Sequence, residues 1–153
     1  MAKTAHGVAR YQQMQTPIDH TAAILVDSDA FVGLFYEKDA HHQEATALFA
    51  DLEAKSRSIV VTSFVITETA TVLSHRKDQT VARAFLKWVE TVPTIYITEE
   101  LQREALDFFK KQTLKGTSVI DCANAVVMTR FHIPQILGFD GIYTKKWGLQ
   151  RAG

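Results

Sequence analysis

The chain has 153 residues, of which 46% are hydrophobic and 22% charged, and its formal net charge is zero. This length is enough for one domain to fold without a disulfide or a structural metal. The single cysteine, Cys122, excludes an internal disulfide framework and suits a reducing compartment. Because the net charge is zero, binding of nucleic acid by bulk electrostatics alone is disfavoured.

Residues 1–22 show little apolar periodicity and contain Pro17, so they are predicted to form a flexible N-terminal extension. They hold no apolar segment of the kind found in secretory signals, and no later run is long enough to cross a membrane. We therefore expect a cytoplasmic protein, with no membrane contact, whose single domain spans residues 23–153.

The first predicted element of the domain is a β-branched, wholly apolar strand over residues 24–26 that ends on Asp27. A short helix over 30–36 follows it, and Asp29 is expected to cap that helix. Asp39 is expected to cap the next helix, over 40–55, in which apolar residues recur at helical spacing.

A second buried strand, over 58–62, leads directly into a helix over 64–76 that carries Glu68 in its first two turns. A helix over 79–90, a third strand over 94–98 and an amphipathic helix over 99–112 come next.

Ser118 and Asp121 then approximate a capping box that opens a helix reaching about residue 131. A fourth strand, over 135–139, ends on Asp140. Strands that alternate with helices in this way predict a three-layer α/β/α domain whose central parallel sheet has four or five strands.

Four acids lie where strands end or where the following helices begin: Asp27, Glu68, Asp121 and Asp140. Open α/β sheets bind ligands at this edge. Two carboxylates about 5 Å apart repel by roughly 3 kcal/mol at an effective dielectric near 20, so a cluster needs a cation or shared protons. Oxygen ligands alone suit Mg²⁺ or Mn²⁺. Glu68 has the alternative role of a charge near a helix N-terminus, and Asp121 that of a capping residue.

The acids and their surroundings resemble the spaced signature of the PIN-domain ribonucleases, including toxins of the VapC type. The matching segments are Ile24-Leu25-Val26-Asp27-Ser28, Ile66-Thr67-Glu68-Thr69, Ser118-Val119-Ile120-Asp121-Cys122-Ala123-Asn124-Ala125 and Phe139-Asp140. The resemblance implies that Asp27, Glu68, Asp121 and Asp140 bind Mg²⁺ or Mn²⁺ and catalyse cleavage of single-stranded RNA, with Ser28 as a polar partner. It also implies a homodimer and, for the toxin branch, an antitoxin protein.

The sequence departs from that family pattern near Asp140. Gly138 replaces the usual Thr or Ser two residues before the acid, and residues 141–146 contain no further acid.

Two alternatives remain open at this point. Asp27 and Asp29 also resemble the D-x-D of haloacid-dehalogenase-type phosphatases, in which Asp27 would be the nucleophile and Asp29 a general acid/base. Phe31, however, stands where that motif has Thr or Val. A PIN-like module that binds RNA or a partner protein without cutting is the second alternative.

Overall fold

The computed structural model of the protein describes residues 19–153. The predicted extension, residues 1–22, lies outside the described residues as far as residue 18. In its last part, Asp19 caps a short 3₁₀ helix, η1 (His20–Ala22), through a hydrogen bond from the Thr21 N–H to its carboxylate. None of the helices in residues 19–153 combines the length and the apolar character needed to span a bilayer.

The centre of the molecule is a five-stranded sheet with the order β3-β2-β1-β4-β5. β1 pairs in parallel with both β2 and β4, and the two outer pairings are parallel as well. The strands are β1 (Ile24–Val26), β2 (Ile59–Thr62), β3 (Thr94–Ile95), β4 (Gln135–Leu137) and β5 (Gln150–Arg151). The predicted parallel sheet is thus confirmed, and β1, which carries Asp27 at its end, lies in the middle.

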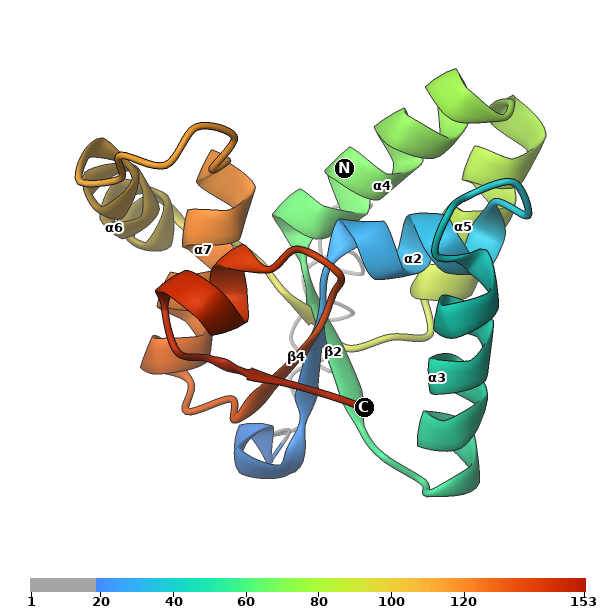
Figure 1. Ribbon diagram of the computed structural model, residues 1–153, viewed down its shortest axis with the longest axis horizontal. Coiled ribbons are helices and arrows are strands. Elements are labelled where there is room, and N and C mark those ends of the chain that lie inside the picture. Colours follow the sequence, from blue (N-terminus) through green and yellow to red (C-terminus); the bar gives the residue numbers. More distant parts are fainter. Residues whose placement is uncertain (1–18) are drawn as a thin grey trace, which may run out of the picture.

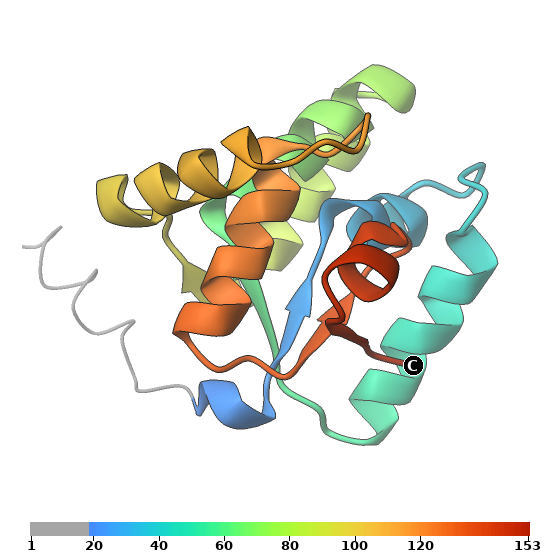
Figure 2. The same ribbon diagram turned by 60° about the vertical axis from the view of Figure 1, so that its left-hand side comes forward.

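Helices cover both faces of this sheet (Figures 1 and 2). They are α2 (Ser28–Phe35), α3 (His42–Ala54), α4 (Ser63–Arg76), α5 (Gln79–Val89), α6 (Glu99–Lys110) and α7 (Val119–Arg130). A π-helical turn, η2 (Ile142–Lys146), connects β4 to β5. The three-layer α/β/α architecture predicted from the alternating pattern is confirmed.

Side chains of the strands point alternately to two cores, as parallel strands buried on both faces require. Ile24 and Val26 pack with the side chains of α2 to α5, including Phe31 and Phe85. Leu25, between them, packs in the second core with residues of α6, α7 and η2.

Two of the predicted helix caps are wrong. Asp27, and not Asp29, is the N-cap of α2, since the helix begins at Ser28, two residues earlier than its apolar residues suggest. Asp39 precedes the cap position of α3, which is His41; its carboxylate instead accepts the His41 N–H and forms an ion pair with Arg76. An Asx turn of this kind competes with capping for the same carboxylate.

Candidate active site

The carboxyl ends of β1 and β2 run directly into α2 and α4, so the N-termini of these two helices lie at one edge of the sheet (Figure 1). Side chains from α7 and η2 reach the same edge, as their contacts with Asp27 show. The site predicted from the strand ends is therefore built from four separate parts of the chain.

Asp27 is buried at the end of β1, and three donors hold its carboxylate. Its Oδ1 accepts the Ser28 N–H at 2.8 Å and the side-chain amide of Asn124 at 3.0 Å. Its Oδ2 accepts the hydroxyl of Tyr143 at 2.9 Å. One oxygen is thus occupied by α2 and α7, while the other faces Tyr143.

Asp121 has the capping role that the sequence predicted, and its second oxygen reaches the acidic edge of the sheet. It closes a full capping box with Ser118, in which its Oδ2 accepts the Ser118 N–H at 2.7 Å. Its Oδ1 lies 3.1 Å from the Tyr143 hydroxyl. The cap fixes one oxygen and leaves the other to face Asp27 across that hydroxyl.

Tyr143 and Asn124 are buried members of the site to which sequence reasoning gave no role. The Asn124 amide also donates to the Tyr143 oxygen at 3.1 Å, and the Asn124 carbonyl oxygen accepts the Thr62 hydroxyl at 3.4 Å at the end of β2. The side chain of Asn124, on α7, is therefore hydrogen-bonded to the residue that follows β1, to the end of β2 and to η2.

A sequence signal existed for Asn124 but not for Tyr143. Asn124 follows Asp121 by three residues, which places both on one helix face, and it stands among small and apolar residues where an amide needs buried partners. Tyr143 follows the last strand within η2, and its aromatic ring would suit any core position.

Asp29 fixes the segment that carries Asp140. Its Oδ2 accepts the backbone N–H groups of Phe139 and Asp140 at 2.8 and 3.0 Å, which ties the end of β4 to the first turn of α2. Asp140 itself is exposed, and its Oδ1 accepts the Ile142 N–H at 2.9 Å. Asp140 thus lies beside the acidic pair but does not contact it.

Gly138 has no side chain, which leaves room for Asp27 and Asp29 beside its backbone. A Cβ at this position would lie 3.1 Å from the Asp27 Cβ and 3.3 Å from Asp29 Oδ1, closer than ordinary van der Waals contact. The departure from the usual Thr or Ser therefore matches the close approach of two carboxylates to this backbone.

Glu68 is half-buried on α4, five residues past the first residue of the helix, or about 7.5 Å along its axis. Within residues 19–153 it makes neither a hydrogen bond nor an ion pair. The structure thus brings Asp27 and Asp121 together and places Glu68 on the helix above the same edge without contact to them.

Burial dominates the electrostatics of the site. It raises the pKa of Asp27 well above its ordinary value, and the negative charges of Asp29 and Asp121 act in the same direction, against the Ser28 N–H and the Tyr143 hydroxyl. Burial also raises the pKa of Asp29 and, together with the two nearby carboxylates, that of Tyr143. Tyr143 consequently stays protonated, so it remains a hydrogen-bond donor.

The donor set suits a hard cation that keeps part of its water shell. Between residues 19 and 153, no three His, Cys, Asp or Glu side chains come close enough to hold a metal ion among themselves. Mg²⁺ usually binds through only one or two carboxylates together with waters and substrate phosphate, which fits Asp27 and Asp121. Asp29 Oδ1 is buried without a partner, and this oxygen and Asp27 Oδ2 lie 3.3 and 3.5 Å from the position that a Gly138 Cβ would take. Asp27 and Asp29 thus each direct one carboxylate oxygen toward the backbone of Gly138.

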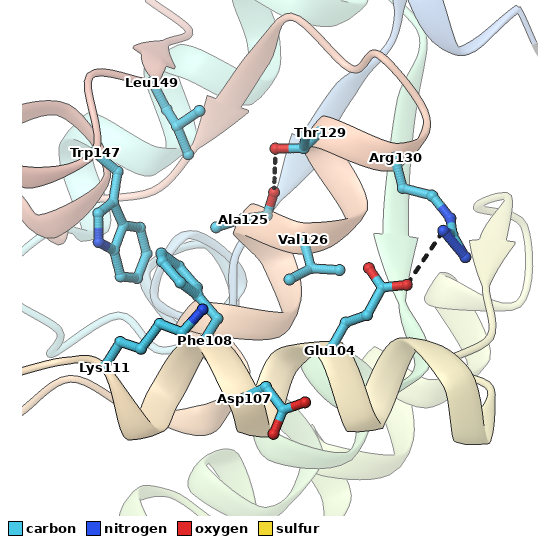
Figure 3. A pocket seen from close by; sticks show the side chains of 10 residues that line it. All are labelled: Glu104, Asp107, Phe108, Lys111, Ala125, Val126, Thr129, Arg130, Trp147 and Leu149. Carbon is cyan, nitrogen blue, oxygen red and sulfur yellow. Dashed lines mark hydrogen bonds and ion pairs between the residues drawn. The ribbon is translucent and has the colours of Figure 1, made fainter.

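A cavity of about 570 Å³ lies apart from this site, between α6, α7 and the segment after η2 (Figure 3). Phe108 and Trp147 form its aromatic end, and Glu104 pairs with Arg130 at the other end at 3.2 Å. None of the four predicted acids lines it, so it contributes nothing to the acidic site.

The fold and the site define an α/β/α domain with buried, paired carboxylates at the ligand-binding edge of a parallel sheet. The PIN-domain family model matches residues 24–146, and the chain belongs to this family. The haloacid-dehalogenase alternative is thereby wrong. In agreement, Asp29 is engaged by two backbone N–H groups, and Phe31 is buried in an aromatic cluster with Phe49, Phe85 and Trp88.

Two similar proteins carry ribonuclease names. A VapC ribonuclease of Archaeoglobus fulgidus is 31% identical over 127 residues, which make up 80% of this chain and 80% of that protein. The 23S rRNA-specific endonuclease VapC20 of Mycobacterium tuberculosis is 26% identical over 123 residues, covering 79% of this chain and 92% of that protein.

Solved structures share the fold. The crystal structure of M. tuberculosis VapC20, described as a Sarcin-Ricin loop cleaving toxin, matches with a TM-score of 0.70 at 24% identity, over 77% of this chain and 90% of that one. VapBC2 from Rickettsia felis, bound to a DNA fragment from the promoter, matches with a TM-score of 0.55 at 12% identity, over 84% of this chain and 96% of that one.

Proposed function

We propose that the protein is an endoribonuclease that cleaves single-stranded RNA with Mg²⁺ or Mn²⁺, and that it is the toxin of a toxin-antitoxin pair. The observation that carries this proposal is the convergence of Asp27 Oδ2 and Asp121 Oδ1 on one point at the carboxyl edge of the sheet. Family membership and the ribonuclease names of the similar proteins support it.

Asp27 and Asp121 would hold the cation, with Glu68 and Asp140 as the further proposed ligands, direct or through water. A divalent cation bound there would supply a water of lowered pKa and stabilise the negative charge that develops on the phosphate. The protein's part is to hold the two carboxylates adjacent, through the Tyr143 hydroxyl between them, and Asp29 holds the backbone of Asp140 beside them.

Lys145 and Lys146 suit the approach of RNA. They lie on η2, the turn that carries Tyr143, and both are exposed. In the described part of the chain neither lysine forms an ion pair, so both are free to contact phosphate. Since the net charge is zero, RNA binding should rest on few contacts and weaken only gradually with salt.

An antitoxin protein and a second copy of the chain are the proposed protein partners. The VapBC2 match supports the antitoxin, because that structure was obtained as a complex. We also propose a cytoplasmic location, which the proposed RNA substrate and the buried free cysteine, Cys122, support.

The test is cleavage of a fluorescent single-stranded RNA by the purified protein with Mg²⁺, with Mn²⁺ and with EDTA. We expect cleavage with either metal and none with EDTA, and we expect Asp121→Asn to abolish cleavage while the fold persists. Asp107→Asn is the matched control, because Asp107 is an exposed carboxylate on α6. Equal turnover by Asp121→Asn and the wild type would refute the site.

A PIN-like module that binds RNA without cutting is the second candidate, because the described residues offer no third ligand in contact with the acidic pair. RNA binding that persists in EDTA, without cleavage under any metal, would favour this module.

A further inference from the structure

The Tyr143 hydroxyl lies between the two acids of the site. The hydroxyl oxygen lies 2.9 Å from Asp27 Oδ2 and 3.1 Å from Asp121 Oδ1, and these are the two oxygens that the backbone N–H groups of Ser28 and Ser118 do not occupy. The oxygens available to a ligand are therefore the ones that Tyr143 brings together.

The four residues of this hydrogen-bonded group are all buried. The exposed fraction is 0% for Asn124, 1% for Tyr143, 3% for Asp27 and 9% for Asp121. Asp121 is thus the most exposed of the four, so the Tyr143 hydroxyl and both carboxylates meet inside the protein at a point that solvent reaches mainly beside Asp121.

Tyr143 cannot withdraw from this position without opening the core. Its ring packs against Trp147 at 5.8 Å in an edge-on arrangement, and its carbonyl oxygen accepts the Leu149 N–H at 2.8 Å. The Asn124 amide, held in turn by Thr62, fixes the hydroxyl oxygen from the side.

We propose that Tyr143 is a positioning residue that holds Asp27 Oδ2 and Asp121 Oδ1 side by side for a divalent cation. This inference rests on the proposed function. Without the hydroxyl, two buried carboxylates would face one another with no donor between them, and they would repel and turn apart. The cation would then have to reassemble its own ligands, which weakens its binding.

The test is Mn²⁺ binding in the absence of RNA, measured from the spectroscopic signal of free Mn²⁺. Groups that orient metal ligands are worth about 10- to 100-fold in affinity, so Tyr143→Phe should raise the Mn²⁺ dissociation constant by roughly that factor. Two controls should leave it unchanged: Tyr96→Phe, which removes an exposed tyrosine hydroxyl, and Ile133→Val, which trims the same core.

The outcomes separate this inference from the proposed function. A wild type that binds no Mn²⁺ overturns both. A wild type that binds Mn²⁺, together with a Tyr143→Phe variant that binds equally or more tightly, overturns the positioning role alone.

If the Tyr143→Phe variant does not fold, a second measurement on the wild type tests the same role. In NMR spectra of wild-type protein labelled at the tyrosine Cζ carbons, the Tyr143 signal should shift in proportion to the fraction of sites that hold Mg²⁺, and the Tyr96 signal should not move. A Tyr143 signal that ignores saturating Mg²⁺ refutes the role.

Discussion

Asp27→Asn is expected to stabilise the metal-free protein. The substitution preserves volume and most of the hydrogen bonds. The new carbonyl oxygen can accept from Ser28 and Asn124 as Oδ1 does now, while the new amide can donate to the Tyr143 oxygen. The Tyr143 hydroxyl is then free to donate to Asp121, whose Oδ1 already lies 3.1 Å away.

The magnitude follows from the distances to that hydroxyl. Asp27 Oδ2 and Asp121 Oδ1 lie 2.9 and 3.1 Å from it, so they are at most about 6 Å apart. Two unit charges at this separation repel by about 3 kcal/mol at an effective dielectric of 20. Weaker hydrogen bonds to a neutral acceptor cost roughly 1 kcal/mol or somewhat more. We therefore expect a gain of about 1 to 2 kcal/mol, or roughly 2 to 8 °C in melting temperature.

Thermal melts of wild type and Asp27→Asn at pH 7.5, in EDTA and in Mn²⁺, measure the stability gained by the substitution and the stability gained by metal binding. Mn²⁺ at ten times its dissociation constant should stabilise the wild type by about 1.4 kcal/mol and the variant by much less. Asp107→Asn serves as the control for loss of a surface charge.

The reasoning would be refuted by a variant that loses about 1 to 3 kcal/mol in EDTA together with a wild type that ignores Mn²⁺. In that case Asp27 would act as a hydrogen-bonded structural acid.

Further predictions concern pH, packing, anchoring and thiol chemistry. The folded-state pKa of Asp27 is raised above the ordinary 3.8, so the stability that Asp27 contributes is full below about pH 4 and is lost as the pH rises through the raised pKa. Urea unfolding in EDTA should show this decline in the free energy of unfolding, and the Asp27→Asn variant should show a flatter pH dependence. Gly138→Ala should cost about 1 to 3 kcal/mol and weaken Mn²⁺ binding, whereas unchanged binding would mean that the backbone yields freely. Asp29→Ala should cost about 1 to 3 kcal/mol by urea unfolding, because two backbone N–H groups lose their acceptor, and a neutral result would show that water replaces it. Burial raises the pKa of the Cys122 thiol to about 11, so iodoacetamide at pH 8 should leave it unmodified in folded protein and alkylate it in urea; rapid alkylation without urea would show that α7 opens.

The layers of the fold could be predicted from the sequence because their signals are local. Apolar β-branched runs predicted the first, second and fourth strands to within two residues at either end. The short edge strand β5 (Gln150–Arg151) was not located, since its two residues are exposed and polar and their pairing with β4 depends on the docked segment. The caps at Asp29 and Asp39 failed because a carboxylate can serve several neighbouring N–H groups, and the tertiary contacts decide which one it takes.

The candidate site was only half accessible to sequence reasoning. Asp27 and Asp121 could be placed because strand ends and helix starts converge at one edge of a parallel sheet. The roles of Asn124 and Tyr143 depend on how α7 and η2 pack, which no periodicity describes. Glu68 and Asp140 remain predicted ligands on the same edge.

The hydrogen bonds of the Tyr143 hydroxyl also constrain the order of folding. The bond to Asp27 spans 116 positions of the chain and the bond to Asp121 spans 22. Their formation therefore closes long loops and should come late. During synthesis the N-terminal part of the chain emerges first, and it carries Asp27 without the partners that arrange it. We expect the chain to lack a formed acidic site until β4 has docked beside β1 and η2 has brought Tyr143 into contact with the acids. The cell that makes this protein would then meet an active nuclease only after folding is nearly complete.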